Sequence, residues 1–394
     1  MSREVVVASA VRTAIGTFGG SLKDVPPTEL AALVVRESLS RARTDGQEVG
    51  HVVFGHVVNT EPGDICLSRI AALKGGCAEG TPAFNVNRLC GSGLQAVVSA
   101  SQSILLGDTD IAIGGGAECM SRAPHASLAS RWGAHMADAK PVDMLTGALS
   151  DPFHAIHMGV TAEHVASRHG ITREMQDALA LESHQRAERA IAAGRFREQI
   201  VPVTIRSRQG KTRFATDEHF RAGAALEDFS QLKPVFAREN GTVTAGNAAG
   251  INDAAAALVL MEAQTARSRG IEALARLVGC AQTGLDPQYM GVGQIPATQS
   301  VLDKTGLSVR DLDVIETSEA FAAQACAVTR ELGLDPARVN PNGSGISLGH
   351  PIGATGAIIT VKALHELRRI QGRYALVTMW TGGGQGIAAI FERL

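Results

Sequence analysis

Short runs of β-branched and apolar residues alternate with stretches of helical periodicity along the first third of the chain. Strands are expected at residues 5–8, 52–58, 83–86 and 111–114, and helices at residues 28–43 and 91–106. Pro27 suits the first turn of the earlier helix, because that turn leaves its N–H groups without partners and proline has none. This alternation indicates an α/β fold with a mostly parallel sheet.

The last third repeats this order of elements. Strands are expected at residues 275–278, 314–316 and 375–378, and helices at residues 297–305 and 353–367. The segments NRLCGSGLQA and SLGHPIGATGA each place one reactive residue, Cys90 or His350, on a turn into a helix. We interpret this as an internal duplication, in which each copy presents one reactive side chain at the end of a central strand.

The pattern breaks down between these two parts, roughly over residues 120–270. Residues 120–158 are rich in Ala, His, Met and Pro, and a charged helix at 173–193 and a β-like stretch at 201–205 follow. A long irregular segment between two α/β units is usually functional. The alternative is a solvated insertion.

Composition and charge exclude several classes of protein. The 394 residues are 45% hydrophobic and 19% charged, which is typical of globular chains. Lys and Arg number 37 against 39 Asp and Glu, and no basic stripe stands out, so we expect no nucleic-acid partner. We identify no apolar run of the roughly 18 residues that span a bilayer, and no signal peptide. A cytoplasmic protein without membrane contact is expected.

The cysteines and histidines do not predict a metal site. The six cysteines form no CxxC or Cys/His ligand spacing. His154 and His157 lie three residues apart in HAIH, but no third ligand is evident, so a loop pair near a ligand or plain surface histidines are better interpretations. The glycine runs at 114–118 and 381–386 match no phosphate-binding motif and fit close strand–helix packing, although the second run is also suited to line a reaction centre with N–H groups.

Cys90 is the strongest candidate for a nucleophile. It follows the strand-like segment FNVNRL and precedes a helix, where the helix dipole is expected to lower the thiol pKa toward neutrality. Gly91 and Gly93 leave room for an acyl group, and the N–H of Cys90 is a candidate oxyanion donor. The alternative is an inert buried cysteine.

His350 is the candidate general base. It lies on a glycine-rich turn between Gly349 and Pro351, just ahead of another helix, and a histidine there has little packing to do. The alternative is a histidine of the core.

Seven motifs together resemble the thiolases, in order and over nearly the whole chain. They are NRLCGSGLQA, GGGAECMSRAP, HMGVTAE, TAGNAAGINDAAAALVLM, EAFAAQ, NPNGSGISLGHPIGATGA and GGGQG, and they look closest to the bacterial β-ketothiolases. The resemblance implies duplicated halves in a five-layered αβαβα core with an inserted loop domain, and a homodimer or homotetramer. The implied boundaries are 1–119 and 249–269 for the N-terminal half, 120–248 for the loop domain and 270–394 for the C-terminal half.

The resemblance also implies roles for individual residues. The cysteine that matches Cys90 takes the acyl group, and the histidine that matches His350 activates it. The positions that match the family's contacts to coenzyme A and the acyl chain are His157, Met158, Arg221, Phe236, Ala249 and Phe321.

Three positions depart from the family pattern. Trp380 replaces a second cysteine that acts as the base at carbon, Ser318 replaces the Asn of NEAFA, and Ala249 replaces the Ser of GNASG. Indole has no titratable group near pH 7, and its ring is expected to fill the space of the second acyl group. The alternatives are a substitution introduced at Trp380 and a chain that has lost catalysis.

The prediction is therefore a thiolase-like acyl-CoA acyltransferase with an acyl-Cys90 intermediate and His350 as base. Backbone N–H groups around Cys90 and Gly383 are expected to stabilise the oxyanion. The unknown acyl acceptor is expected to be altered, to a heteroatom or to a carbon made nucleophilic by decarboxylation. The alternatives are an ordinary β-ketothiolase and a non-catalytic acyl-CoA-binding homologue. Coenzyme A thioesters are expected as substrates, with no permanently bound cofactor.

Overall fold

The computed structural model describes residues 3–134, 136, 138–207 and 210–394. Its central sheet has two parts. The N-terminal part has the strand order β4 (Ala83–Val86), β3 (His51–Gly55), β5 (Ile111–Cys119), β13 (Asn252–Glu262) and β1 (Val5–Thr13). The C-terminal part has the order β15 (Leu312–Thr317), β16 (Tyr374–Thr381), β17 (Gln385–Arg393) and β14 (Ala275–Gly284). The two parts join where β1 pairs with β14.

The two parts repeat one topology, which confirms the predicted duplication. β15, β16, β17 and β14 take the places of β3, β5, β13 and β1, and a bridge between Ile315 and Val339 stands where β3 meets β4. The expectation of a mostly parallel sheet is wrong, because β13 and β17 run antiparallel to both of their neighbours. A three-residue turn joins β16 to β17, and such a turn is too short for a parallel crossover.

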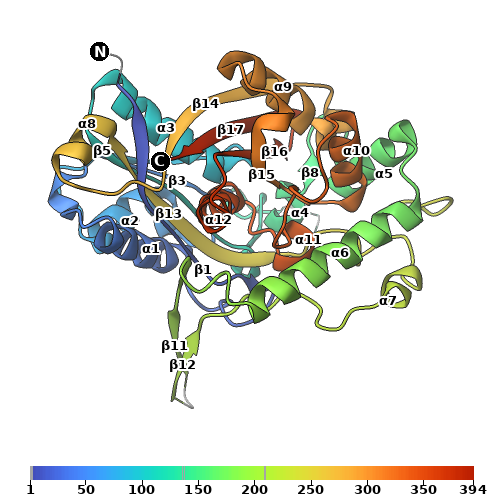
Figure 1. The fold of residues 1–394 in the computed structure, drawn as a ribbon. Coiled ribbons are helices and arrows are strands. Elements are labelled where there is room, and N and C mark those ends of the chain that lie inside the picture. Colours follow the sequence, from blue (N-terminus) through green and yellow to red (C-terminus); the bar gives the residue numbers. More distant parts are fainter. Residues whose placement is uncertain (1–2, 135, 137, 208–209) are drawn as a thin grey trace.

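The helices complete five layers (Figure 1). α3 (Ser92–Leu106) and α12 (Thr355–Arg369) pack against each other between the two parts of the sheet. α1 (Pro27–Arg41) and α2 (Leu67–Gly75) cover the N-terminal part, and α9 (Gln294–Thr305) covers the C-terminal part with α10 (Ala322–Glu331) beside it. The αβαβα arrangement is as expected.

The segment between β5 and β13 forms short elements and one long helix, α6. Its elements are β6 (His125–Ala126), β7 (Val142–Asp143), α4 (Met144–Ala148), β8 (Ser150–Asp151), β9 (Ile156–His157), α5 (Met158–His169), α6 (Arg173–Ala192), β10 (Ile200–Val201), β11 (Val203–Ser207), β12 (Gly210–Phe214) and α7 (Leu226–Ser230). The remaining elements are β2 (Gly16–Thr17), α8 (Ala263–Ser268), α11 (Gly345–Leu348) and five 3₁₀ turns at Gly46–Glu48, Pro62–Cys66, Met120–Arg122, Pro287–Val292 and Val309–Asp311.

The two glycine runs serve different purposes. Gly114 and Gly116 bring β5 close to the central layer, because a Cβ at Gly114 would lie 2.6 Å from Val97 of α3 and one at Gly116 would lie 2.4 Å from the Gly353 carbonyl. In the second run, strand–helix packing holds for Gly386 of β17, because a Cβ there would lie 1.8 Å from the carbonyl of Gly293, the N-cap of α9. Gly383 and Gly384 have φ values of +77° and +76° and form the turn between β16 and β17.

One helical segment is long and apolar enough to cross a membrane, which corrects the expectation that no such stretch exists. It covers Leu89–Leu106 and thus includes α3. Because 67% of this segment is buried inside the fold, between the two parts of the sheet, it has the properties of a core helix.

Candidate active site

An apolar cavity of about 290 Å³ brings most of the predicted site residues together. Those that line it are Cys90, His157, Met158, Phe236, Ala249, Phe321, His350 and Trp380. Three predicted residues do not line it: Arg221, Ser318 and Gly383. The cavity thus holds the candidate nucleophile and base from the two halves, and four of the predicted residues from the segment between β5 and β13, namely His157, Met158, Phe236 and Ala249.

Cys90 lies just before α3, whose N-cap is Gly91. Its side chain is buried, and burial raises the pKa of the Cys90 thiol to about 12, although the backbone N–H groups of Cys90 and Gly382 favour the thiolate. The expectation of a pKa near neutrality is therefore wrong. Removal of the thiolate from water raises the pKa of the thiol by more than the N–H groups at the start of α3 lower it. A neighbouring base has to remove the proton during the reaction.

Gly382, the neighbour of the predicted oxyanion donor Gly383, is the residue of the glycine turn whose backbone N–H contacts the Cys90 sulfur. Gly382 provides the backbone N–H that favours the Cys90 thiolate. A Cβ at Gly382 would lie 2.3 Å from Leu89 Cδ1 and 2.5 Å from Met158 Cε, so a larger residue there would displace these two side chains.

Two buried polar side chains fix the turn that carries His350. Asn252 of β13 accepts a hydrogen bond from the His350 backbone N–H at 2.9 Å, and Glu118 of β5 accepts one from Gly353 N–H at 2.9 Å. A Cβ at Gly349 would lie 2.5 Å from the Asn252 side chain, so this turn approaches β13 closely. Neither residue was predicted from the sequence, although a polar residue inside an otherwise apolar strand is a signal for such a role.

Thr355 sets the tautomer of the His350 ring. The Thr355 hydroxyl donates to the Pro351 carbonyl at 2.9 Å, so its oxygen is left to accept from Nδ1–H of His350, 2.8 Å away. Nδ1 therefore carries the proton and Nε2 carries the lone pair. Nε2 is buried and has no hydrogen-bond partner among the described residues.

The His350 ring is neutral over the physiological range. Burial lowers the pKa of His350 to about 4. A neutral imidazole with a free Nε2 lone pair, in the same cavity as a protonated thiol, is suited to accept the thiol proton.

Trp380 fills one end of the cavity. It is 1% exposed, packs with Met158 and Met290, and stacks on Phe321 with ring centroids 6.4 Å apart. Its indole N–H has no partner among the residues that the structure describes. Ser318 is also buried, but lies behind the cavity wall, where Gln294 donates to its hydroxyl at 3.4 Å.

Aromatic rings form one wall of the cavity. His157 stacks on Phe236 at 4.7 Å, and Phe236 meets Phe321 edge to face at 6.3 Å. Arg221 lies outside this wall, where its guanidinium donates to the carbonyl of Ala245, a residue of the cavity lining, at 3.4 Å.

The other histidine of the HAIH segment lies apart from the cavity lining. His154 forms an ion pair with Asp151 at 2.7 Å when it is protonated. Over the described part of the chain, no group of three or more His, Cys, Asp and Glu side chains is arranged to hold a metal ion.

Known proteins match this chain over its whole length. Residues 5–264 match the model of the thiolase N-terminal domain, and residues 271–393 match that of the thiolase C-terminal domain. The beta-ketothiolase BktB of Cupriavidus necator is 68% identical over 394 residues, which is 100% of both chains. The acetyl-CoA acetyltransferase of Pseudomonas aeruginosa is 46% identical over 393 residues, 99% of this chain and 100% of that protein.

Solved structures of related proteins superpose closely on this chain. The acetyl-CoA acetyltransferase of Bacillus anthracis superposes with a TM-score of 0.98 at 44% identity, covering 100% of this chain and 99% of that one. Human mitochondrial 3-ketoacyl-CoA thiolase in complex with CoA superposes with a TM-score of 0.96 at 40% identity, covering 100% and 98%. The expectation of an altered acyl acceptor is wrong, because these relatives carry the names of the ordinary thiolase reaction.

Proposed function

Because the chain belongs to the thiolase family of acyl-CoA-dependent acyltransferases, we propose that it catalyses the ordinary β-ketothiolase reaction. In that reaction a 3-ketoacyl-CoA and coenzyme A give acetyl-CoA and a shortened acyl-CoA, and the reverse direction condenses two thioesters. The observation that carries the proposal is the shared cavity, in which the Cys90 thiol and the unpartnered Nε2 of His350 occur together.

In the first half-reaction, His350 accepts the Cys90 proton while the sulfur attacks the ketone carbon of the substrate. The N–H groups of Cys90 and Gly382 stabilise the oxyanion. The bond between the ketone carbon and the α-carbon then breaks. This leaves the acyl group on Cys90 and an acetyl-CoA enolate, which needs one proton.

That proton returns from His350. The three titratable residues of the described cavity lining are Cys90, His157 and His350, and Cys90 is acylated at this stage. The proton that leaves the thiol therefore ends on the α-carbon, and the balance closes without a second cysteine. In the second half-reaction, the coenzyme A thiol attacks the acyl-Cys90 while His350 takes its proton. His350 then returns this proton to the Cys90 sulfur as that sulfur leaves, which restores the free enzyme.

Trp380 limits the acyl groups that fit beside Cys90. Its ring is buried against Phe321 and Met290 and fills space that a smaller side chain would leave open. We propose that short acyl groups are the substrates. Ser318 lies outside the cavity lining, so its role is indirect, through Gln294.

We propose that the loop domain, residues 120–248, holds coenzyme A. The N-terminal half then covers residues 1–119 and 249–269, and the C-terminal half covers residues 270–394. His157, Met158 and Phe236 come from this segment and line the cavity. We assign Arg221, which lies outside the wall, to the phosphates, because a guanidinium group suits bidentate contact with them. Coenzyme A thioesters are substrates here, and the reaction needs no permanently bound cofactor.

We further propose a cytoplasmic homodimer or homotetramer. β4 is an edge strand with a half-exposed Phe84, and such an edge offers unpaired backbone groups to a second copy. Leu128 and Trp132, which are 76% and 83% exposed, provide apolar surface elsewhere.

The test is cleavage of acetoacetyl-CoA by coenzyme A, followed by loss of the enolate absorbance, together with intact mass after incubation with acetoacetyl-CoA alone. We expect steady turnover and one acetyl mass on the Cys90 peptide. Cys90→Ser should lose the adduct and the turnover. Turnover that survives in Cys90→Ser, or a parent protein with neither adduct nor turnover, would overturn the proposal.

A further inference from the structure

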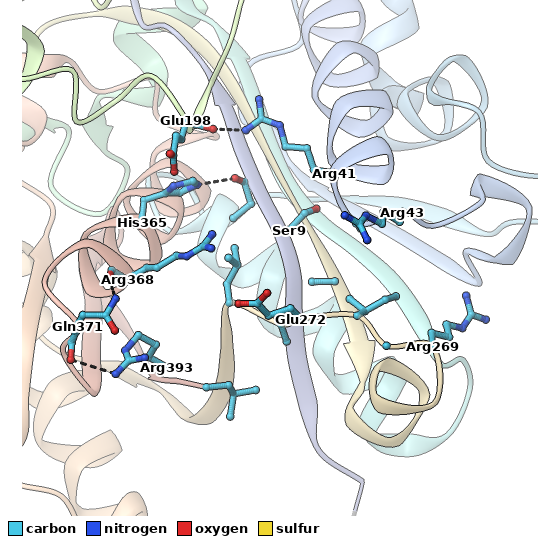
Figure 2. Close-up of a pocket in the computed structure, with 18 residues that line it drawn as sticks. Ser9, Arg41, Arg43, Glu198, Arg269, Glu272, His365, Arg368, Gln371 and Arg393 are labelled. Carbon is cyan, nitrogen blue, oxygen red and sulfur yellow. Dashed lines mark hydrogen bonds between the residues drawn. The ribbon is translucent and has the colours of Figure 1, made fainter.

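A second, larger cavity of about 970 Å³ lies at the other end of α12 from His350. Figure 2 shows the residues that line it. β1 residues 8–10 form its floor, and its walls come from the end of α1, the loop before β14, the last turns of α12 and the C-terminus. The helix starts at Thr355 beside His350, and Arg368 lies at the cavity, so the rise of an α-helix separates the two by about 20 Å. No residue lines both cavities among those described.

The rim of this cavity is rich in positive charge, although the chain as a whole carries −2. Five arginines surround it: Arg41, Arg43, Arg269, Arg368 and Arg393. Among the described residues that line the cavity, the carboxylate side chains are those of Glu198 and Glu272. Glu37 and Glu48 neutralise Arg41 and Arg269, so three arginines remain against these two carboxylates, a small positive excess that favours an anionic ligand.

Three of these arginines are already engaged. Arg41 pairs with Glu37 at 2.8 Å, Arg269 pairs with Glu48 at 2.8 Å, and Arg393 donates to the backbone of Gly372 at 2.7 Å.

The other two are free. Neither Arg43 nor Arg368 has a side-chain hydrogen bond or an ion pair among residues 3–134, 136, 138–207 and 210–394, and the same holds for the carboxylates of Glu198 and Glu272. Arg43 comes from the end of α1 and Arg368 from the end of α12, so two free guanidinium groups reach the cavity from different walls.

The backbone of Arg43 adopts an unfavourable conformation. Its φ is +49°, in the left-handed region, because it follows the C-cap of α1 and its N–H bonds back to Ser40 at 3.1 Å. Glycine is the favoured residue there, since a Cβ destabilises this conformation. No side-chain hydrogen bond or ion pair of Arg43 offsets that cost within the described chain. Such strain is typical of positions that are kept for a function.

We propose that this cavity binds a phosphorylated small molecule of nucleotide size, with Arg43 and Arg368 on its phosphates. Guanidinium forks match phosphate oxygens in pairs. The unpaired carboxylates of Glu198 and Glu272 accept hydrogen bonds from hydroxyl or amino groups, which a nucleotide has and inorganic phosphate lacks. The volume lies at the upper end of the range of small-molecule sites.

The test uses ADP as the probe and the full-length protein, with isothermal titration calorimetry and adenosine as the uncharged control. We expect ADP to bind and adenosine not to bind. Arg43→Gly and Arg368→Gln should each weaken ADP at least tenfold, whereas Arg310→Gln, an exposed arginine away from the cavity, should not. Arg43→Gly should also raise the melting temperature, because glycine removes the strain. Misfolding therefore does not explain lost binding in that variant.

Three outcomes would overturn the proposal. The first is a parent protein that does not bind ADP, and the second is an ADP affinity that is equal in the parent and both cavity variants. The third is competition between ADP and coenzyme A in the thiolysis assay that Arg43→Gly leaves unchanged. The third would place ADP in the active-site cavity. The first two do not depend on whether the thiolase reaction itself is observed.

Discussion

Thr355→Val should slow acylation of Cys90 without weakening the binding of coenzyme A. Valine has the shape of threonine but lacks the hydroxyl, so the variant removes only the acceptor for His350 Nδ1–H. The Pro351 carbonyl keeps its backbone donors Ala354 and Thr355, both within 2.9 Å, so the turn remains satisfied.

The magnitude follows from the burial of the site. Thr355 is 3% exposed and His350 is 6% exposed, so water cannot replace the lost oxygen. A buried donor without a partner costs about 1–3 kcal/mol. The ring avoids that cost by moving its proton to Nε2, where it can no longer accept one from Cys90. The competent tautomer should fall by the same free energy, which is roughly 5- to 150-fold in rate.

Single-turnover acylation by acetoacetyl-CoA measures this rate, and ¹⁵N chemical shifts of the His350 ring report the tautomer directly. Thr355→Ser keeps the oxygen and serves as the matched control, so it should retain a rate within a few fold of the parent. If Thr355→Val acylates as fast as Thr355→Ser and leaves the ¹⁵N spectrum unchanged, the tautomer argument is wrong.

Other residues of the site have equally specific expected outcomes. Trp380→Cys should raise acetoacetyl-CoA cleavage by about 10²–10⁴-fold, because a thiol can share the proton transfer at carbon, whereas Trp380→Phe should give no such rise. Arg221→Ala should raise the Kd of coenzyme A while leaving acylation by an N-acetylcysteamine thioester nearly unchanged, and an equal loss with both substrates would assign Arg221 to structure. Burial lowers the pKa of His350 and of His184 to about 4, below the unfolded value of about 6.5. Between these two pH values the unfolded state binds more protons than the folded state, so the free energy of unfolding should fall as the pH drops from 6.5 to 4. The fall should be less steep in His350→Asn, and urea titrations at several pH values measure the free energy of unfolding.

The sequence predicted the elements around the reactive residues well, because local signals define them. The strand at 83–86 has the expected bounds, and α3 begins one residue after the expected start. β13 was missed, since its run of four alanines has little β-propensity and its burial between β1 and β5 decides its structure.

The pKa of Cys90 could not be predicted from its local sequence. The helix N-terminus is a local feature and favours the thiolate, whereas desolvation depends on the cavity that Met158, His350 and Trp380 build from distant parts of the chain. Asn252 and Glu118 were missed for the same reason, because the turn that they hold lies about 100 residues or more away along the sequence.

The position of β13 also constrains how the chain folds during synthesis. Val5 of β1 pairs with Glu262, about 250 residues later, so at 5–20 residues per second β1 waits for this partner for roughly 12–50 s. Until then β1 and β5 expose strand edges, which are sites of aggregation. A fragment that ends before residue 252 lacks the strand that joins β1 to β5, so the N-terminal half should not fold independently when the chain is cut within the preceding segment.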